Sequence, residues 1–424
     1  MNIGLKFYKF LNLIASPILF SLVFIRLFRG KESKSRFEER FGIPSFKTRP
    51  KGKLIWFHAT SVGEVVSILP TLKALALDKR FNGTLLLTST TLGSLRLLEK
   101  RNLSKKIIHQ FCPIDNFFTV KNFINFWKPN LTVFVESEFW PYALSYAAAV
   151  GNVISLNTSI SDKSFKRWSA LKFFTNDVLK KIKKFFPKSV TDFQKLKALG
   201  FNNAEHIGNL KYSTPILPFK QKELQELRKS IKKRKVILFA STHPGEDELA
   251  IKAFKILKKK YPSLLCILIP RHPTRTREIC KLMQAASLAF TLRSHSTRKI
   301  PSNAAFYIVD TIGDTGLFFA LSPITIMGGS FVNIGGHNLI EPTKLNSVVI
   351  SGPYTHNFKD IVEEFKKKKA ACFAKDYKDC TLIIENLLSD KKLLNTYKKK
   401  AASLIDSKNN ILKRVTDNLI KYIN

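Results

Sequence analysis

The sequence predicts an α/β protein made of two doubly wound, Rossmann-like domains. The chain has 424 residues, too many for one ordinary hydrophobic core and enough for two domains. From Lys53 onward, short apolar runs alternate with longer amphipathic ones, and the alternation begins again at Val236. Strands that alternate with helices form a parallel sheet covered on both faces. We therefore expect two domains facing a cleft, with a ligand outside the carboxyl ends of the strands.

The composition favours an anionic partner and a reducing compartment. The formal charge is +40, from 71 Lys and Arg against 31 Asp and Glu, which suits a phosphorylated substrate or an acidic lipid surface. The alternative is a lysine bias spread over solvated faces. No RNA-binding aromatic motif, zinc finger or helix-turn-helix pattern is found, so we expect no nucleic-acid partner. Five cysteines without a CxxC pair predict free thiols and no metal site.

Residues 1–30 are expected to form an N-terminal membrane anchor. The run 10–25 is uncharged and mostly apolar, with lysines before it and Arg26 directly after it. At about 1.5 Å per residue it falls short of a ~30 Å hydrocarbon core unless its flanks contribute. It lacks a small-residue cleavage site, so we expect a retained helix that spans the bilayer or lies in its interface. A buried core helix is the alternative. The Lys-rich body predicts a cytoplasmic location.

The first Rossmann-like domain is predicted at residues 31–211. Its apolar runs predict strands at 54–57, 85–88, 107–111, 131–135 and 153–156. Its amphipathic stretches predict helices at 66–77, 92–100, 117–127, 141–149, 171–184 and 190–199. Two prolines mark residues 212–219 as the linker.

The second domain is predicted at residues 220–390. Strands are expected at 236–240, 264–269, 289–292, 306–309, 324–327 and 348–351. Helices are expected at 246–259, 275–286, 313–321, 340–344 and 358–368. Residues 391–424 are predicted to form a C-terminal helical segment that packs back across the cleft.

Glu64 is a candidate general base because it follows the first predicted strand, near the start of a helix. The alternative is a first-turn acid that the helix dipole favours. His58, at the end of the same strand, is interpreted as a packed or hydrogen-bonded histidine. Glu136 and Glu138 follow the fourth strand. If that strand continues, both carboxylates point to the same side, where they could bind sugar hydroxyls or a cationic transition state. The alternative is one helix cap and one solvated side chain.

Four loops of the second domain have patterns that suit a phosphate. Residues 328–342 follow an apolar run and contain two glycine pairs. In the same stretch Asn338 and Glu341 have capping-box spacing, and Pro342 suits a first helical turn. Strand, glycine loop and helix N-terminus together can bind a phosphate, although a well-capped turn is the alternative. Loops 241–246, 270–273 and 310–314 also follow predicted strands, and Arg271 could pair with a phosphate. Together these loops predict a nucleotide site.

Seven short motifs in order give the chain a specific resemblance to a known family. Over nearly its whole length it resembles the bacterial 3-deoxy-D-manno-octulosonic acid (Kdo) transferases of the lipopolysaccharide pathway. The motifs that carry this resemblance are residues 39–42, 61–64, 136–141, 208–211, 241–246, 270–273 and 328–341.

The resemblance implies a GT-B fold and an inverting transfer of Kdo from CMP-Kdo to an anionic lipid A precursor (lipid IVA), with no metal or cofactor. It implies Glu64 as general base, and Glu136 and Lys211 in transition-state stabilisation. The implied substrate-binding residues are Ser61, Gly63, Glu138, Ser241, Thr242, Pro270, Arg271, Ile312, Gly313, Asp314, Gly329, Ser330, Gly336, His337, Asn338, Leu339, Ile340 and Glu341. It also implies attachment to the cytoplasmic face of the inner membrane, which fits the anchor and the positive charge.

The chain departs from the family's pattern at two positions. Asp314 stands where the family usually has Glu, and Ser159 stands where it usually has Arg. Two alternatives stay open: a GT-B transferase or epimerase that uses a UDP-sugar, and a membrane-attached binding protein with a decayed site. Nucleic-acid binding through the +40 charge is a third, less favoured alternative. Because neither departure touches Glu64, we expect an active enzyme.

Overall fold

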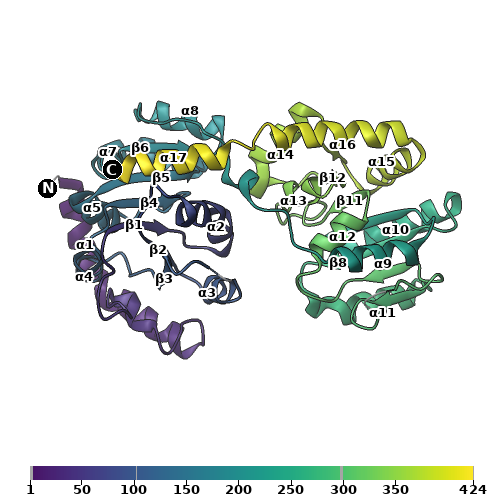
Figure 1. The fold of residues 1–424 in the computed structure, drawn as a ribbon, viewed down its shortest axis with the longest axis horizontal. Helices are drawn as coiled ribbons and strands as arrows, with labels where there is room; N and C mark the ends of the chain where they lie inside the picture. Colours follow the sequence, from purple (N-terminus) through teal and green to yellow (C-terminus); the bar gives the residue numbers. More distant parts are fainter. Residues whose placement is uncertain (1–2, 102, 297–298, 424) are drawn as a thin grey trace. The chain divides into compact units, whose positions relative to one another are not determined.

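The chain folds into two compact units. The computed structural model describes residues 3–101, 103–296 and 299–423 (Figure 1). Unit 1 comprises Met1–Thr214 and Asn409–Asn424, and unit 2 comprises Pro215–Lys408. The C-terminal helices are divided between them, because α16 (Lys391–Asp406) belongs to unit 2 and α17 (Ile411–Ile423) to unit 1.

Unit 1 is built on a six-stranded parallel sheet with the order β3-β2-β1-β4-β5-β6. Its strands are β1 (Lys53–His58), β2 (Gly83–Ser89), β3 (Ile107–Phe111), β4 (Leu131–Val135), β5 (Asn152–Thr158) and β6 (Lys184–Pro187). Its other helices are α1 (Ile3–Phe28), η1 (Phe37–Phe41), α2 (Val62–Leu77), α3 (Leu92–Glu99), α4 (Phe117–Trp127), α5 (Pro141–Val150), α6 (Asp162–Ala170), α7 (Lys172–Leu179), α8 (Val190–Ala198) and η2 (Leu210–Ser213). Trp56, Phe123 and Trp127 are fully buried in its core.

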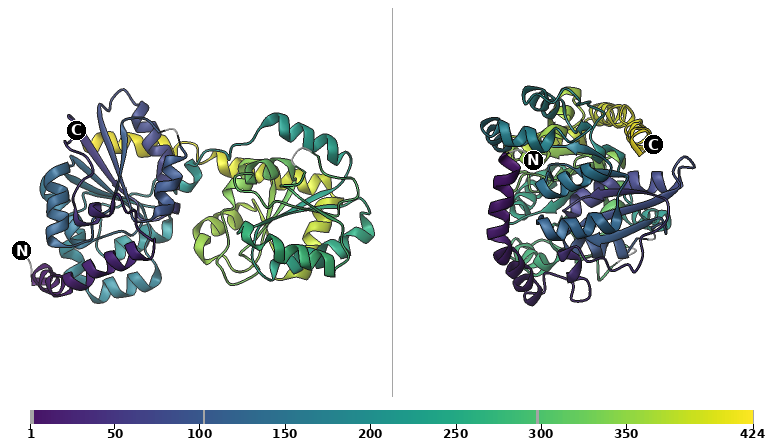
Figure 2. Two further views of the ribbon diagram at one scale, coloured as in Figure 1. Left: turned by 90° about the horizontal axis from the view of Figure 1, so that it is seen from below. Right: turned by 90° about the vertical axis from the view of Figure 1, so that its left-hand side faces the viewer.

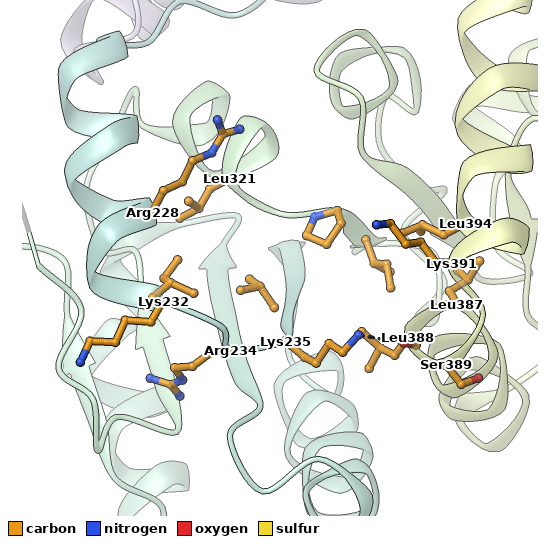
Figure 3. Close-up of a pocket in the computed structure, with 14 residues that line it drawn as sticks. Arg228, Lys232, Arg234, Lys235, Leu321, Leu387, Leu388, Ser389, Lys391 and Leu394 are labelled. Atoms are coloured by element: carbon orange, nitrogen blue, oxygen red, sulfur yellow. Dashed lines mark hydrogen bonds between the residues drawn. The ribbon is translucent and has the colours of Figure 1, made fainter.

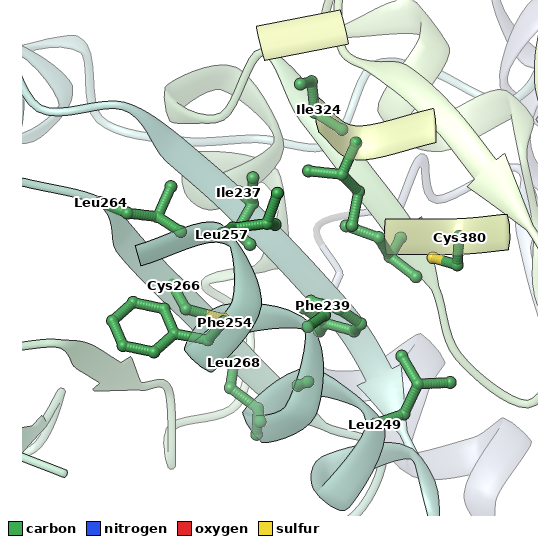
Figure 4. Close-up of a cluster of buried hydrophobic side chains, with 14 of the residues drawn as sticks. Ile237, Phe239, Leu249, Phe254, Leu257, Leu264, Cys266, Leu268, Ile324 and Cys380 are labelled. Carbon is green, nitrogen blue, oxygen red and sulfur yellow. The ribbon is translucent and has the colours of Figure 1, made fainter. Parts of the chain in front are cut away.

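Unit 2 is built on a seven-stranded parallel sheet with the order β13-β12-β11-β7-β8-β10-β9. Its strands are β7 (Val236–Thr242), β8 (Leu265–Pro270), β9 (Phe290–Leu292), β10 (Phe306–Ile308), β11 (Ile324–Met327), β12 (Val348–Ser351) and β13 (Cys372–Phe373). Its remaining helices are α9 (Gln221–Ile231), α10 (Glu246–Lys260), η3 (Pro273–Arg275), α11 (Thr276–Ala285), α12 (Thr315–Leu321), α13 (Ile340–Lys344), η4 (His356–Phe358), α14 (Lys359–Lys368) and α15 (Tyr377–Ser389). Phe239, Phe254 and Leu268 pack between β7, β8 and α10 (Figure 4).

The predicted pair of doubly wound parallel sheets is confirmed, with one local error. The stretch 171–184 does not form a single helix, because α7 ends at Leu179 and Lys184 begins β6. Phe185 and Phe186 are buried against the edge of the sheet, so they favour a strand over a longer helix. The strands β6 and β13 and the helices α6, α9 and α15 were not predicted.

Helix α1 lies along the flank of unit 1 (Figure 2), where it packs against α4, α7 and η1. Within the described residues it is the one helix that is long and apolar enough to cross a membrane, over Tyr8–Phe28. Only 17% of an 18-residue apolar stretch of this helix is buried, so α1 is not the buried core helix that the alternative interpretation required.

The segment after α1 is fixed by buried charges. Glu39 is fully buried and accepts a hydrogen bond from Phe111 N at 2.6 Å. Arg40 pairs with the buried Glu32 at 2.9 Å and donates to the carbonyl oxygens of Thr90 and Cys112. Because removing one partner of a buried pair leaves an uncompensated charge, this cluster holds η1 firmly against β2 and β3.

Gly42 ends η1 and gives a test of this packing. Its φ is 77°, and an added Cβ would lie 2.0 Å from the carbonyl oxygen of Thr119. We expect Gly42→Ala to lower the free energy of unfolding of unit 1 by at least ~2 kcal/mol more than Gly200→Ala, measured by urea unfolding. Gly200 is the matched control, since its φ of 93° carries the same strain without any clash. Equal losses for the two variants would contradict the packing.

Candidate active site

Glu64 lies in the first turn of α2, directly after β1. Ser61 is the N-cap residue of α2, and its hydroxyl accepts from Glu64 N at 3.2 Å and contacts Glu64 Oε1 at 2.7 Å. Glu64 Oε2 accepts from Thr60 N at 2.8 Å. The carboxylate is thus fixed by its own loop, with Ser61 and Gly63 exposed around it.

The environment of Glu64 favours its neutral form. The side chain is 8% exposed, and burial is the largest cause that raises its pKa to about 7. The charges of Glu136 and Glu138 raise the pKa further, while the hydrogen bonds from Ser61 and Thr60 lower it. Near neutral pH the group can therefore both hold and release a proton, as a general base must.

Glu136 and Glu138 lie in the loop after β4, but not as a continuing strand. β4 ends at Val135, and Glu136 has a φ of 58°, so the strand geometry that would aim both carboxylates alike is absent. The condition for that prediction is therefore not met, yet both charges act on Glu64, because β4 is the neighbour of β1. Both side chains are half-buried, and Glu138 accepts from Trp140 Nε1 at 2.7 Å.

Lys211 lies in η2, which is attached to the end of β5. Asn157, at φ 57°, accepts from Leu210 N at 3.0 Å, and Asn209 accepts from Lys211 N at 2.9 Å. Lys211 is half-buried and its helix packs against α2. The ends of β1, β4 and β5 therefore contribute Glu64, Glu136 and the support of Lys211 to one edge of the sheet.

Two other positions singled out from the sequence, His58 and Ser159, make hydrogen bonds within unit 1. His58 is fully buried, its Nδ1 lies 3.0 Å from Thr88 Oγ1, and burial followed by Arg40 lowers its pKa to about 3. It is a packed histidine, as predicted. Ser159 is engaged through its backbone carbonyl, which accepts from the hydroxyl of Ser137.

In unit 2, four predicted loops meet at one edge of the sheet. They follow β7, β8, β10 and β11, which are consecutive in the order β11-β7-β8-β10. The loops after β7 and β11 meet at two histidines, since the Nε2 atoms of His243 and His337 lie 3.1 Å apart in stacked rings. One of the two Nε2 atoms therefore carries the hydrogen and donates a hydrogen bond to the other. Arg271 is exposed and near enough to lower the pKa of both.

Glu246 holds two loops of this site together, a role that the sequence did not reveal. It is 2% exposed and accepts from Gly329 N at 2.7 Å, Phe331 N at 3.0 Å and His243 N at 3.0 Å. One carboxylate thereby joins two loops that lie more than 80 residues apart in sequence. Spacing alone carries no signal for this contact, because it depends on the tertiary fold.

The glycine loop is consequently not the free amide cradle that the sequence suggested. The N–H groups of Gly329 and Phe331 already bind Glu246. Ser330 is fully buried, donating to Met327 O at 2.5 Å and accepting from Gly352 N at 2.8 Å, so its side chain holds the loop to β12 and does not face a ligand. Gly328 permits the close approach, since a Cβ there would lie 2.3 Å from Ser241 O.

Several other predicted binding residues can act only through their backbone. Thr242, Pro270, Gly336, Leu339 and Ile340 are buried. Thr242 donates to Asp247 at 2.6 Å, and Asp247 pairs with Arg275 at 2.5 Å, which ties the β7 loop to η3. By contrast, Ser241 is half-exposed in a left-handed conformation.

The remaining predicted residues lie on two loops. Ile312 and Gly313 are exposed, while Asp314 pairs with Arg293 at 3.1 Å and accepts from Thr311 Oγ1 at 2.5 Å. The predicted capping box is not formed, because Leu339 is the N-cap of α13.

Asn338 and Glu341 nevertheless meet. Asn338 Oδ1 accepts from Ile340 N at 3.1 Å, and its amide donates to Glu341 at 3.2 Å.

The described residues show no metal cluster at these loops, and one cavity of unit 2 lies far from them. Over the described ranges, no group of three or more His, Cys, Asp or Glu side chains could hold a metal ion. A cavity of about 450 Å³ opens at the opposite edge, beside the first residues of β7 and β11 (Figure 3). Three of its cations are engaged: Arg228 donates to Ala320 O, Arg234 to Leu264 O and Lys235 to Leu388 O, each at 3.1 Å.

This chain is similar to known proteins in its sequence and in its fold. The family model "3-Deoxy-D-manno-octulosonic-acid transferase (kdotransferase)" matches residues 35–214. The 3-deoxy-D-manno-octulosonic acid transferase of Rickettsia bellii is 36% identical and covers 99% of both chains. That of Haemophilus influenzae is 30% identical over 84% of this chain and 83% of its own. A glycosyltransferase structure from Rickettsia africae has a TM-score of 0.61 at 15% identity, over 88% of this chain and 99% of that one, which is a likeness of fold alone.

Glu246→Gln tests the junction between the two loops. A glutamine amide nitrogen cannot accept a hydrogen bond, so at least one of the three N–H groups loses its partner, at a cost of ~1–3 kcal/mol. We expect the amides of Gly329, Phe331 or His243 to exchange hydrogen ~10–100-fold faster, measured residue by residue. The control is Glu248→Gln, which perturbs only the bond to Gly245 N. Unchanged exchange at all three amides would exclude the junction.

Proposed function

Since this chain belongs to the 3-deoxy-D-manno-octulosonic acid (Kdo) transferase family, we propose that it moves Kdo from CMP-Kdo to a lipid A precursor, with Glu64 as the general base. The chain is a glycosyltransferase with two doubly wound parallel sheets, the GT-B arrangement. The observation that carries the assignment of the base is the buried carboxylate of Glu64, with a pKa of about 7 at the carboxyl edge of the unit 1 sheet.

The proposed reaction is a single displacement. Glu64 takes the proton of the acceptor hydroxyl, and the oxygen attacks the anomeric carbon of Kdo on the face opposite the nucleotide. The bond from that carbon to the phosphate oxygen breaks, and CMP leaves with the electron pair. The sugar gains positive charge as the bond breaks, which the half-buried carboxylate of Glu136 would stabilise. Glu64 afterwards returns its proton to solvent.

Unit 2 is proposed to hold the nucleotide. The guanidinium of Arg271 is exposed and has no side-chain partner in the part of the chain that the structure describes, so it is available to a phosphate. His337 lies beside it, and its pKa of about 4, lowered by burial and then by Arg271, makes it neutral at pH 7. A neutral ring can accept or donate a hydrogen bond without competing with Arg271 for the anion. Lys211 is proposed to balance phosphate charge as CMP departs.

The membrane assignment follows from α1 and the surface charge. We place the enzyme on the cytoplasmic face of the inner membrane, held by α1. The net charge of +40 favours an anionic lipid acceptor and an acidic bilayer surface.

Glu64→Gln tests the general base. The amide keeps the size of the side chain but cannot take a proton, so kcat should fall by ~10²–10⁴-fold with the KM for CMP-Kdo little changed. The measurement is transfer to lipid IVA followed by mass spectrometry, which also counts the Kdo residues added. Glu99→Gln, at an exposed acid on α3, is the control and should keep full turnover. A Glu64→Gln enzyme with normal kcat would remove Glu64 from the mechanism.

The pH profile tests the environment of Glu64. Because only the ionised carboxylate accepts a proton, kcat/KM should rise with pH through an apparent pKa near 7. Ser61→Ala removes a hydrogen bond that lowers this pKa, so the acid limb should move to higher pH. Ser67→Ala is the control, since Ser67 donates only to the backbone oxygen of Glu64. A limb that stays in place in Ser61→Ala would show that another group sets it.

The donor is tested directly by offering the purified enzyme CMP-Kdo or UDP-sugars with the same acceptor. We expect transfer from CMP-Kdo alone, because Arg271 and the loops around it match the CMP-binding segments of the family. Transfer from a UDP-sugar alone would favour the alternative GT-B enzyme, and no transfer from any donor would favour a binding protein.

A further inference from the structure

One face of α1 is fastened to unit 1 by polar side chains. The hydroxyl of Tyr8 donates to Asp115 Oδ2 at 2.8 Å, and Asn12 donates to Asp115 O at 2.9 Å. Asn116 donates to Asn12 Oδ1 at 2.8 Å and to Ser16 Oγ at 2.7 Å. Asn12, Ser16 and Asn116 are all buried. These are specific contacts along two turns of the helix and not incidental touching.

The attachment continues towards the end of the helix. The rings of Phe20 and Phe24 lie 5.5 Å and 5.8 Å from that of Phe41. Arg26 then pairs with Glu32 at 2.7 Å. From Tyr8 to Arg26 the contacts extend over roughly 27 Å of helix at 1.5 Å per residue, close to its full apolar length.

The opposite face of α1 is apolar and uncovered. Its stripe consists of Leu11 (48% exposed), Ile14 (61%), Ile18 (66%), Leu22 (47%) and Ile25 (44%). At ~100° per residue these five positions fall within an arc of about 80°, away from Tyr8, Asn12 and Ser16. A contiguous exposed stripe of this size is typical of a protein or membrane interaction surface.

The charge around the stripe selects a lipid surface as its partner. No acidic residue occurs before Glu32. Lys9 and Lys121 lie over the ring of Phe117, at 4.6 Å and 5.8 Å, and Arg29 is exposed beyond the end of the helix. An apolar face bordered by cations matches acyl chains beneath anionic head groups.

A helix that crosses the bilayer would have to give up the fastened face. Asp115 is half-buried and also accepts from Tyr142 N at 3.2 Å and Ala143 N at 2.8 Å, so it is held to α5 within unit 1. Withdrawing α1 would leave Asp115 and Asn116 short of partners and would place Asn12 and Ser16 in hydrocarbon, each at a cost of ~1–3 kcal/mol.

We propose that α1 lies flat in the interface of an anionic membrane, with the Leu11–Ile25 stripe among the acyl chains and the other face on unit 1. Asp115 follows β3 and binds the first turn of α5, directly after the loop of Glu136 and Glu138. The membrane surface is thus attached at the carboxyl edge that carries Glu64. If the proposed function holds, the lipid acceptor reaches the base while its acyl chains stay in the bilayer.

The orientation is measured by labelling each stripe position in turn. Leu11, Ile14, Ile18, Leu22 and Ile25 are replaced singly by Cys in a Cys280→Ser background and spin-labelled, on vesicles of phosphatidylethanolamine and phosphatidylglycerol. We expect all five labels at one shallow depth, ~5–10 Å below the phosphates, from collision with oxygen and a nickel chelate. A crossing helix would instead show a depth gradient of ~21 Å between positions 11 and 25. Such a gradient, or labels buried in a dimer of the lipid-free protein, would overturn the proposal.

Substitution separates this inference from the proposed function. Ile14→Glu with Ile18→Glu should lower vesicle partitioning at least tenfold, whereas Leu77→Glu, at an 83% exposed leucine of the same unit, should change it less than twofold. The double variant should keep transfer to a water-soluble acceptor analogue and lose transfer to vesicle-embedded acceptor. Equal partitioning of the two variants would refute the lipid surface. If the unsubstituted enzyme transfers to neither acceptor, the proposed function fails while the depth profile still decides the orientation.

Discussion

The parallel direction of every strand pairing is the constraint on which the rest of this structure depends. In a parallel sheet each strand must end at the same edge, so loops far apart in sequence are forced together there. In unit 1 this brings Glu64, after β1, under the influence of Glu136, after β4. In unit 2 it stacks His243, after β7, on His337, after β11. Each unit thus brings its predicted site residues together at the carboxyl edge of its sheet.

Acidic residues are scarce in this chain, and several of them accept hydrogen bonds from backbone N–H groups. Against 71 Lys and Arg stand 31 Asp and Glu, yet several of these acids are almost completely buried. Glu39 accepts from Phe111 N, Asp192 from Ile160 N, and Glu246 from three N–H groups. A buried carboxylate that lost those bonds would be strongly destabilising.

The sequence predicts most of the sheet core and the position of Glu64, because apolar runs are long and the acid directly follows one. It does not predict β6 or β13, since a strand of two to four residues at an edge leaves almost no periodic signal. It also misjudges the glycine loop. Free amides at Gly329 and Phe331 are a reasonable expectation from glycine content, but Glu246, 83 residues from Gly329, takes them in the fold. Ser330 is also buried by the tertiary fold, because its hydroxyl bonds Met327 O at the end of β11 and Gly352 N after β12.

Helix α1 shows most clearly why composition alone leaves a membrane segment undecided. Its apolar stretch passes the length test for a span, and its few polar side chains do not exclude one by composition. The deciding residues are polar and few: Asn12 and Ser16 occupy the face opposite the stripe, and their partners Asp115 and Asn116 come a hundred residues later. In a hydrocarbon environment those two side chains would be costly, whereas against unit 1 they are paired. The same polar atoms that weaken α1 as a span therefore fix it to the edge of the sheet where Glu64 lies.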